Sequence, residues 1–314
     1  MAVFTPVSNG EAAGFLAGYD LGGLVALTPI AEGVENTNYR LETDRGLFVL
    51  TLFEGRSEAS ALPFCLGLTD HLAAAGLPAA RPMADRDGGW IGRLKARPAA
   101  IVEWRSGAWL RDPDACDLKQ AGALLARMHL AAADYPGRRD NPVGPPAWRG
   151  LADRISAEAS GEAARLLDRV EAELAALGDP FDESLPGGAI HADYFPDNLL
   201  FDHGAPSGVI DFYFACTATW TYDLAIALSA WGFHADGRAR PDALVAFQQG
   251  YESVRRLTPL ERAALPGLGR AAVLRFTLTR LHDQVFHDPA KLVTPKDPVV
   301  FMRRLDHWRA FDQS

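Results

Sequence analysis

Three short stretches between residues 24 and 53 are either apolar or alternate between apolar and polar residues. Residues 24–30, 38–42 and 47–53 carry patterns that are typical of strands. The sequence Thr-Asp-Arg-Gly at residues 43–46 separates the last two stretches and predicts a tight turn. We therefore expect an antiparallel hairpin over residues 38–53.

Helical patterns flank these strands. Residues 10–20 predict a short helix with Asn9 as its cap, and residues 58–75 place leucines at helical spacing. Gly76 stands where that second helix should stop, and Pro63 marks a break or restart in its first turns. Residues 90–94 and 99–104 then predict two more strands, so this region should form a small sheet with one long helix.

The pattern changes character after about residue 105. Residues 137–148 are proline-rich and predict a long surface loop, and residues 198–212 predict two strands joined by a turn at 203–208. The rest reads as helix, in three stretches: residues 114–133, residues 151–177 and most of residues 222–311.

A sheet-rich segment followed by a helical one predicts the α+β class with two lobes. We expect a small N-terminal lobe at residues 1–104, with an antiparallel sheet and one long helix. A larger, mainly helical C-terminal lobe should cover residues 105–314. Clefts between two lobes are common ligand sites, so chemistry is expected where they meet.

Composition narrows the classes of function. The chain has 314 residues, 48% of them hydrophobic, and a formal net charge of −9. An acidic protein without a basic block is unsuited to bind nucleic acid or an anionic membrane through charge alone. Its three cysteines, Cys65, Cys116 and Cys216, are widely spaced and predict neither a disulfide framework nor a zinc site. The absence of a signal-peptide pattern and of a long apolar run predicts a cytoplasmic protein.

One segment concentrates the groups that carry chemistry. His191, Asp193 and Asn198 follow the spacing His-x-Asp-x-x-x-x-Asn, and Asp211 ends the apolar run Gly-Val-Ile. This spacing matches a kinase catalytic loop, in which the Asp meets the acceptor hydroxyl and the Asn binds magnesium. A hairpin between Asn198 and Asp211 would bring two oxygen ligands together, as a hard cation requires. The plain alternative is that Asp and Asn only cap turns here.

The same residues carry a resemblance to the aminoglycoside phosphotransferase and choline kinase superfamily, which has a protein-kinase-like fold. Residues 190–201 resemble its catalytic loop, with Ala192 in place of the usual glycine, and residues 209–212 resemble its metal-binding strand. The resemblance implies that Asp193, Asn198 and Asp211 are catalytic, with Asn198 and Asp211 as metal ligands.

Within that superfamily the chain resembles the bacterial homoserine kinase branch. Residues 33–39, 48–54 and 275–283 carry this likeness, in order along the chain. It implies transfer of a phosphoryl group from ATP, assisted by Mg²⁺, to the hydroxyl of L-homoserine in threonine biosynthesis. It also implies a monomer or homodimer that binds small molecules and no nucleic acid. His191 and Asp223 are implied as supports of the loop, although a helix cap would also explain Asp223.

The nucleotide side departs from the usual kinase pattern. No glycine-rich loop is present, and Gly33, Asn36 and Asn38 are the candidates to cover phosphates or simply to form a turn. Thr51 stands where a phosphate-binding lysine is expected, and Glu58 is either the helix glutamate of that motif or a solvated carboxylate.

Adenine and acceptor contacts are expected on either side of the cleft. Backbone groups near Glu103 and Trp104 would bind adenine at the hinge, with Trp104 either in contact or merely packed. For the acceptor amino acid, an arginine suits the carboxylate and an aspartate the ammonium. Arg280 and Asp283 could take these roles or pair with each other. The further acceptor candidates are Tyr194, Asp197 and Arg275.

Three other functions remain open on the sequence. The acceptor could be choline, an aminoglycoside or another small alcohol. Thr51 motivates a nucleotide-binding protein without activity, and the acidic residues would also serve a metal-dependent hydrolase. An assay of ADP release with a panel of acceptors would separate these functions.

Overall fold

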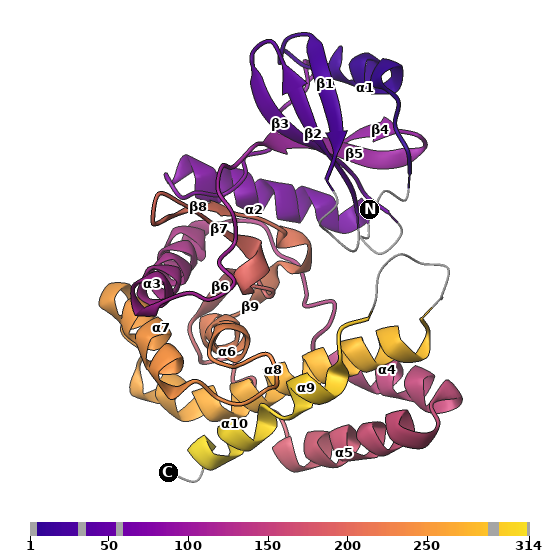
Figure 1. Cartoon of the computed structure of the whole chain (residues 1–314). Helices are drawn as coiled ribbons and strands as arrows, with labels where there is room; N and C mark the ends of the chain where they lie inside the picture. Colours follow the sequence, from indigo (N-terminus) through magenta and orange to yellow (C-terminus); the bar gives the residue numbers. More distant parts are fainter. Residues whose placement is uncertain (1–4, 31–35, 55–58, 288–294, 313–314) are drawn as a thin grey trace.

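The computed structural model describes residues 5–30, 36–54, 59–287 and 295–312. Figure 1 shows a small lobe built around a sheet and a larger helical lobe beneath it. The N-terminal lobe holds α1 (Asn9–Leu16) and a five-stranded sheet, and the C-terminal lobe holds the elements from α3 (Ala115–Ala131) onward. The expected α+β arrangement of a sheet lobe and a mainly helical lobe is confirmed.

The N-terminal sheet is antiparallel and five-stranded, in the order β1-β2-β3-β5-β4. The predicted hairpin is present, with Thr43 opposite Gly46 at its end. In β2 every second residue is buried, so that Tyr39 and Leu41 join the core of this lobe. The strands are β1 (Leu24–Pro29), β2 (Thr37–Thr43), β3 (Gly46–Leu52), β4 (Gly92–Leu94) and β5 (Arg97–Glu103).

The cap of α1 is Ser8 rather than the predicted Asn9. The Ser8 hydroxyl accepts a hydrogen bond from the backbone N–H of Glu11, and the Glu11 carboxylate in turn accepts one from the backbone N–H of Ser8. This reciprocal pair satisfies two N–H groups at the helix start, which Asn9, already within the helix, cannot do.

Helix α2 (Leu62–Ala74) connects the two lobes. Its Leu62 and Leu66 pack with Phe53 of the sheet lobe, whereas Leu68 and Leu72 join the core of the C-terminal lobe. Pro63 lies in its first turn, after a 3-10 turn at Ala59–Ala61, so the helix proper begins later than predicted. The predicted boundary at residues 104 and 105 stays a prediction, since the packing of α2 crosses it.

Two predictions for the C-terminal lobe are wrong in detail. The predicted loop at residues 137–148 ends early, because Pro145 lies in the first turn of a helix, where its missing N–H costs nothing. The single helix predicted at residues 151–177 is two helices, because Ala159 and Ser160 between them have an extended backbone. The helices are α3 (Ala115–Ala131), α4 (Pro145–Glu158), α5 (Gly161–Leu177), α6 (Trp220–Trp231), α7 (Pro241–Val254), α8 (Pro259–Val285), α9 (Pro298–Met302) and α10 (Leu305–Asp312).

Two small two-stranded sheets lie in this lobe, toward the N-terminal one (Figure 1). Strands β7 (Leu199–Asp202) and β8 (Ala205–Val209) form the predicted pair, although the turn is only His203 and Gly204. Both turn residues have positive φ, as two-residue hairpin turns require. The second sheet pairs β6 (Gly187–Ile190) with β9 (Cys216–Thr219) and was not predicted. Together the two sheets place the segment between Ile190 and Cys216 in the middle of the molecule.

Candidate active site

Asn198 holds the side chain of Asp193 in place. Its amide Nδ2 donates to the backbone oxygen of Asp193 at 2.8 Å and to the Asp193 carboxylate at 3.1 Å. Asn198 ends the 3-10 turn Pro196–Asn198 and is 7% exposed. With Nδ2 occupied in this way, the amide oxygen is the atom that Asn198 can offer to a metal ion.

The β7–β8 hairpin brings Asp211 to the same place as Asn198. Leu199 pairs with Val209, and the N–H of Ile210 donates to the backbone oxygen of Asn198 at 3.1 Å. The next residue, Asp211, has a left-handed backbone (φ +64°) and lies at the surface of the lobe. The hairpin therefore brings the backbone of Asp211 beside that of Asn198, whose side chain contacts Asp193, and the shared metal site of the three residues stays a prediction.

His191 lies beneath this loop and supports it on two sides. Its Nε2 lies 3.0 Å from the backbone oxygen of Ile210, and its Nδ1 accepts a hydrogen bond from the Asp193 N–H at 3.2 Å. These contacts require a neutral ring with the proton on Nε2. Burial lowers the pKa of His191, which favours the same neutral form. His191 thereby connects the residue before Asp211 to Asp193.

Asp223, in the first turns of α6, braces the loop from inside the lobe. Its carboxylate accepts the N–H groups of His191 at 3.0 Å and of Ala192 at 2.8 Å. Ala192 has φ +61°, a conformation that favours glycine, and the guanidinium of Arg275 donates to its carbonyl oxygen. Burial raises the pKa of Asp223, but hydrogen bonds, above all from His129, outweigh burial and keep that pKa below its usual value.

A buried polar network continues behind Asp223. His129 Nε2 lies 3.0 Å from the Asp223 carboxylate, and His129 Nδ1 lies 2.8 Å from the hydroxyl of Tyr251. Arg255 donates to that hydroxyl at 3.1 Å and to the buried carboxylate of Glu261 at 2.6 Å. Sequence reasoning missed this network, because its members lie on α3, α6, α7 and α8 and share no spacing.

Thr51 and Asn38 form a neutral pair where a phosphate-binding lysine was expected. The two residues are opposite each other in β3 and β2, and the Thr51 hydroxyl donates to the Asn38 amide oxygen at 2.8 Å. Burial and the charge of Asp211 raise the pKa of Tyr213, which lies two residues after Asp211. A hydrogen bond with Thr51 acts against that rise. Thr51 therefore lies beside the 3-10 turn Phe212–Phe214 that follows Asp211, and it contacts Tyr213 there as a neutral group.

The other nucleotide candidates are placed as follows. Asn36 is buried, and its amide oxygen accepts the N–H of Glu54 at 3.2 Å, so it holds the start of β2 against the end of β3. The Glu103 N–H donates to Arg81 and the Trp104 N–H to Leu47, so adenine would need their carbonyl groups or the N–H groups beyond. Gly33 and Glu58 lie outside the described residues.

Two of the acceptor candidates need correction. Tyr194 is fully buried and its hydroxyl donates to the Ala121 carbonyl at 3.2 Å. Arg275 is 1% exposed and is committed to the Ala192 carbonyl. Both therefore support the loop from within the lobe instead of facing an acceptor.

Arg280 and Asp197 carry charges that act on Asp193 or are acted on by it. Burial lowers the pKa of Arg280, whereas Asp193, Asp197 and Asp297 oppose that shift. Asp197 forms an ion pair with Lys296 at 3.4 Å, a cation that sequence reasoning missed. Asp283 lies 3.6 Å from the Nδ1 of its neighbour His282. Burial raises the pKa of Asp193, and Arg275, His191 and Lys296 act against this rise.

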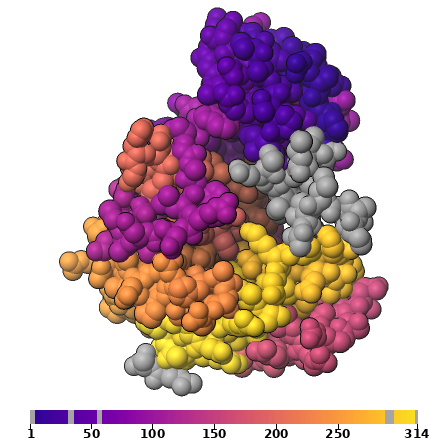
Figure 2. Space-filling model, viewed as in Figure 1, coloured from indigo at the N-terminus to yellow at the C-terminus, as the bar shows by residue number. Residues whose placement is uncertain are grey.

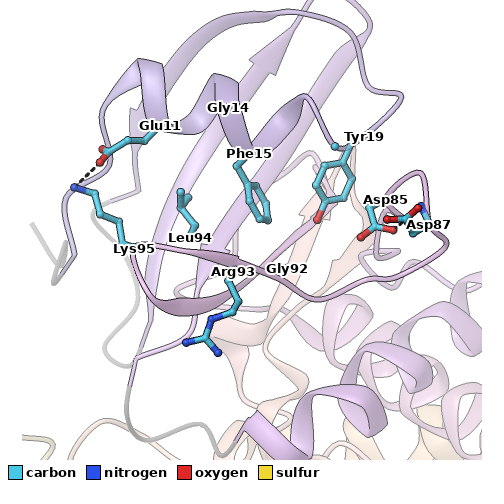
Figure 3. Close-up of a pocket in the computed structure, with 11 residues that line it drawn as sticks. Glu11, Gly14, Phe15, Tyr19, Asp85, Asp87, Gly92, Arg93, Leu94 and Lys95 are labelled. Carbon is cyan, nitrogen blue, oxygen red and sulfur yellow. Dashed lines mark hydrogen bonds and ion pairs between the residues drawn. The ribbon is translucent and has the colours of Figure 1, made fainter.

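The surface is hollowed where the lobes meet, in the face shown in Figure 2. A separate groove of about 610 Å³ lies on the N-terminal lobe, between α1 and β4 (Figure 3). Phe15 and Tyr19 line it, and the ion pair of Glu11 and Lys95, at 2.7 Å, closes one end. None of the predicted catalytic residues lines this groove, so we assign the chemistry to the region between the lobes.

Neither a carboxylate–histidine metal cluster nor a membrane span emerges from the described residues. No three His, Cys, Asp or Glu side chains among them gather as a metal site. None of the helices in the described part of the chain has the length and apolar content to cross a membrane.

Comparison with other sequences agrees with this geometry. Residues 26–257 match the family described as phosphotransferase enzyme family. A homoserine kinase of Methylorubrum populi is 47% identical over 305 residues, which cover 97% of this chain and 95% of that protein. A homoserine kinase of Rhizobium meliloti is 44% identical over 314 residues, covering 100% and 96%.

Solved structures show the same fold at low sequence identity. The amicoumacin kinase hAmiN superimposes with a TM-score of 0.72 at 14% identity, covering 98% of this chain and 94% of that one. A microcompartment-associated aminopropanol kinase superimposes with a TM-score of 0.67 at 19% identity, covering 97% and 95%. At these identities the likeness establishes the kinase-like fold alone.

Proposed function

We propose that this chain, which belongs to the phosphotransferase enzyme family, phosphorylates the hydroxyl of L-homoserine at the expense of ATP. The products would be ADP and O-phospho-L-homoserine, a step in the biosynthesis of threonine. One observation carries the choice of acceptor: homoserine kinases are 44% to 47% identical to this chain over at least 97% of its length. The geometry around Asp193 supports the reaction type.

The acceptor hydroxyl is activated and oriented by Asp193. Its oxygen attacks the γ-phosphorus in line, the bond from that phosphorus to the bridging oxygen of ADP breaks, and the hydroxyl proton passes to the Asp193 carboxylate. Asn198 fixes the direction of that carboxylate through its 3.1 Å hydrogen bond. Transfer is direct, so no residue of the chain needs to carry the phosphoryl group.

Asn198 and Asp211 would hold Mg²⁺. An amide oxygen and a carboxylate are hard oxygen donors, and a magnesium site of this kind completes its shell with phosphate oxygens and water. The bound ion would neutralise charge that develops on the transferred group. The backbone hydrogen bond from Ile210 to Asn198, at 3.1 Å, keeps the two ligands on one end of the hairpin.

The nucleotide would lie between this hairpin and the sheet of the N-terminal lobe. Arg105 donates to Ser207 of β8 at 2.9 Å, and Ala108 pairs with Phe201 of β7, so the hinge and the metal-binding hairpin are connected. Adenine bound at the hinge would then place its phosphates toward Asp211. Thr51 and Asn38 would cover them with neutral hydrogen-bonding groups.

We place the activity in the cytoplasm. Cys65, Cys116 and Cys216 are free thiols in the structure, two of them buried, which suits a reducing compartment.

The test is release of ADP with a panel of acceptors. The wild-type chain is incubated with ATP, Mg²⁺ and one of L-homoserine, D-homoserine, choline or an aminoglycoside, and ADP is measured by a coupled assay. L-Homoserine should give the highest kcat/KM by at least tenfold. ADP release that is independent of acceptor, or highest with choline or the aminoglycoside, would refute the proposal.

A further inference from the structure

One aromatic cluster beside the catalytic turn carries four cations, of which Arg275 and Arg304 are buried and Arg280 and Lys296 reach the surface. Phe195, Phe276 and Phe301 pack together, with ring centroids 4.9 Å apart for Phe195 and Phe276 and 5.0 Å for Phe276 and Phe301. Arg280 lies 4.5 Å above the ring of Phe301, and Lys296 lies 5.7 Å from that of Phe195. The loop that carries Phe195, helix α8 and residues 295–302 therefore bring the cationic groups of Arg280 and Lys296 to one aromatic cluster.

An aspartate completes this group of charges. Lys296 Nζ lies 3.4 Å from the carboxylate of Asp197, which belongs to the same 3-10 turn as Asn198. That turn is attached to Asp193 by the Asn198 amide, so Asp197, four residues after Asp193 in the chain, belongs to the same loop as the carboxylate that meets the acceptor hydroxyl. Arg280 also donates to the backbone oxygen of Asp297, at 3.3 Å, and thereby holds the segment that carries Lys296.

We infer that the ion pair of Lys296 and Asp197 is the receptor for the amino-acid head group of the acceptor. This inference rests on the proposed function and assigns its specificity. The acceptor carboxylate binds Lys296, with Arg280 as the second cation, and the acceptor ammonium binds Asp197. The zwitterion inserts into an existing ion pair and replaces one contact by two.

The exposure of the pair explains why insertion is favourable. The side chains of Lys296 and Asp197 are 58% and 48% exposed. An ion pair so open to water contributes only about 0–1 kcal/mol, so separating its members costs little. Each member then forms a charge-assisted hydrogen bond with the opposite charge of the ligand. An alcohol with an ammonium but no carboxylate would leave Lys296 without a new partner and gain less.

The position also selects for length. Homoserine carries its hydroxyl two methylene groups from the carbon that bears the ammonium and carboxylate. With the head group at Lys296 and Asp197, the hydroxyl reaches inward along the turn toward Asp193. Tyr194 and Arg275 are buried and hydrogen-bonded to backbone carbonyls, so neither side chain is offered at the surface where Lys296 and Asp197 lie.

The test separates binding of the head group from chemistry. Lys296→Met and Asp197→Asn are compared with Lys296→Arg, which keeps the charge, and with Lys119→Met, an exposed lysine on α3. Loss of one charge-assisted hydrogen bond costs about 1.5–3 kcal/mol, which corresponds to a KM for L-homoserine raised roughly 10- to 150-fold. The kcat and the KM for ATP should change less than threefold, and Lys296→Arg should stay within fivefold of wild type.

The possible outcomes are distinct. If Lys296→Met leaves the KM for L-homoserine as Lys119→Met does, or lowers kcat with KM unchanged, the assignment of the head-group site is wrong while the proposed function stands. If the wild type fails to phosphorylate L-homoserine at all, the proposed function itself fails. Equal melting temperatures of the four variants exclude an effect through folding.

Discussion

The carboxylate of Asp223 accepts a hydrogen bond of 2.8 Å from the backbone N–H of Ala192, 31 residues earlier in the chain. On the other side of the same residue, Arg275 donates to the Ala192 carbonyl. Ala192 is thereby held with φ +61°, a left-handed backbone that costs an alanine about 1–2 kcal/mol. Asp193 is the residue that follows this turn, so Asp223 and Arg275 stabilise the backbone from which its carboxylate extends.

Replacement of Asp223 by asparagine should weaken both the fold and the reaction. The amide offers one acceptor oxygen where the carboxylate serves His191, Ala192 and His129, so at least one buried donor is left unpaired. We expect a loss of about 2–4 kcal/mol in the free energy of unfolding, measured with urea, and a lower kcat. Asp306→Asn, at an 82% exposed side chain, is the control and should change neither. Unchanged stability in Asp223→Asn would contradict the bracing role.

Substitutions at Ala192 test whether its left-handed backbone is strained. Ala192→Gly removes the clash of Cβ in the left-handed region and should raise the free energy of unfolding by up to about 1 kcal/mol. Ala192→Val, which is β-branched, should lower stability by about 2 kcal/mol or more and reduce kcat. Urea denaturation of the three forms should give a free energy of unfolding that is highest with glycine, intermediate with alanine and lowest with valine. An order with valine above alanine would show that the backbone is not strained here.

The buried neutral ring of His191 predicts a loss of stability in acid. Burial lowers its pKa in the folded protein from the ordinary 6.5, so the unfolded chain binds more protons once the pH falls below that value. The free energy of unfolding should therefore decline from about pH 6.5 downward and level off below the folded pKa. His307 has a lowered pKa as well and contributes in the same direction.

The slope of the free energy of unfolding against pH shows whether His191 causes the loss of stability in acid. In His191→Asn the decline between pH 7 and pH 5 should be shallower than in wild type, even though the variant is less stable throughout. His203→Asn, at a histidine with a 97% exposed side chain, is the control and should keep the wild-type slope. A slope in His191→Asn as steep as that of wild type would exclude His191 as its source.

Asn198 and Asp211 should set the requirement for Mg²⁺. Asn198→Ala removes an oxygen ligand and the donor that orients Asp193, and Asp211→Asn removes the charge. We expect both variants to need at least tenfold more Mg²⁺ for half-maximal activity and to lose at least 100-fold in kcat. Titration of Mg²⁺ at saturating ATP measures this. Asp168→Asn, on the exposed face of α5, should titrate like wild type. Identical curves for Asp211→Asn and wild type would remove Asp211 from the metal site.

The catalytic segment was predictable from sequence because its signal is local. Asn198 and Asp211 flank the predicted hairpin, so the pairing of Leu199 with Val209 brings their backbones together. The strands β6 and β9 escaped prediction because each has four residues, too few to display a period, and their pairing spans almost the whole site.

Contacts between distant elements could not be predicted from the sequence, for a different reason. Lys296 meets Asp197 only because α8 and α9 fold against the catalytic turn, and 99 residues separate the two. Arg275 matched the resemblance to the homoserine kinase branch, but only burial reveals that it holds Ala192 rather than an acceptor. Pairing of charges across a tertiary interface depends on packing, which local patterns do not encode.

Turnover of Asp193→Asn against L-homoserine tests the central assignment most directly. The amide keeps the shape of the side chain but cannot take up the hydroxyl proton, so kcat should fall about 10²- to 10⁴-fold. The Kd for ATP, measured in the presence of Mg²⁺, should stay within threefold of wild type, since Asn198 and Asp211 remain. A variant that retains more than a tenth of the wild-type kcat would contradict the assignment of Asp193 as the residue that receives the acceptor proton.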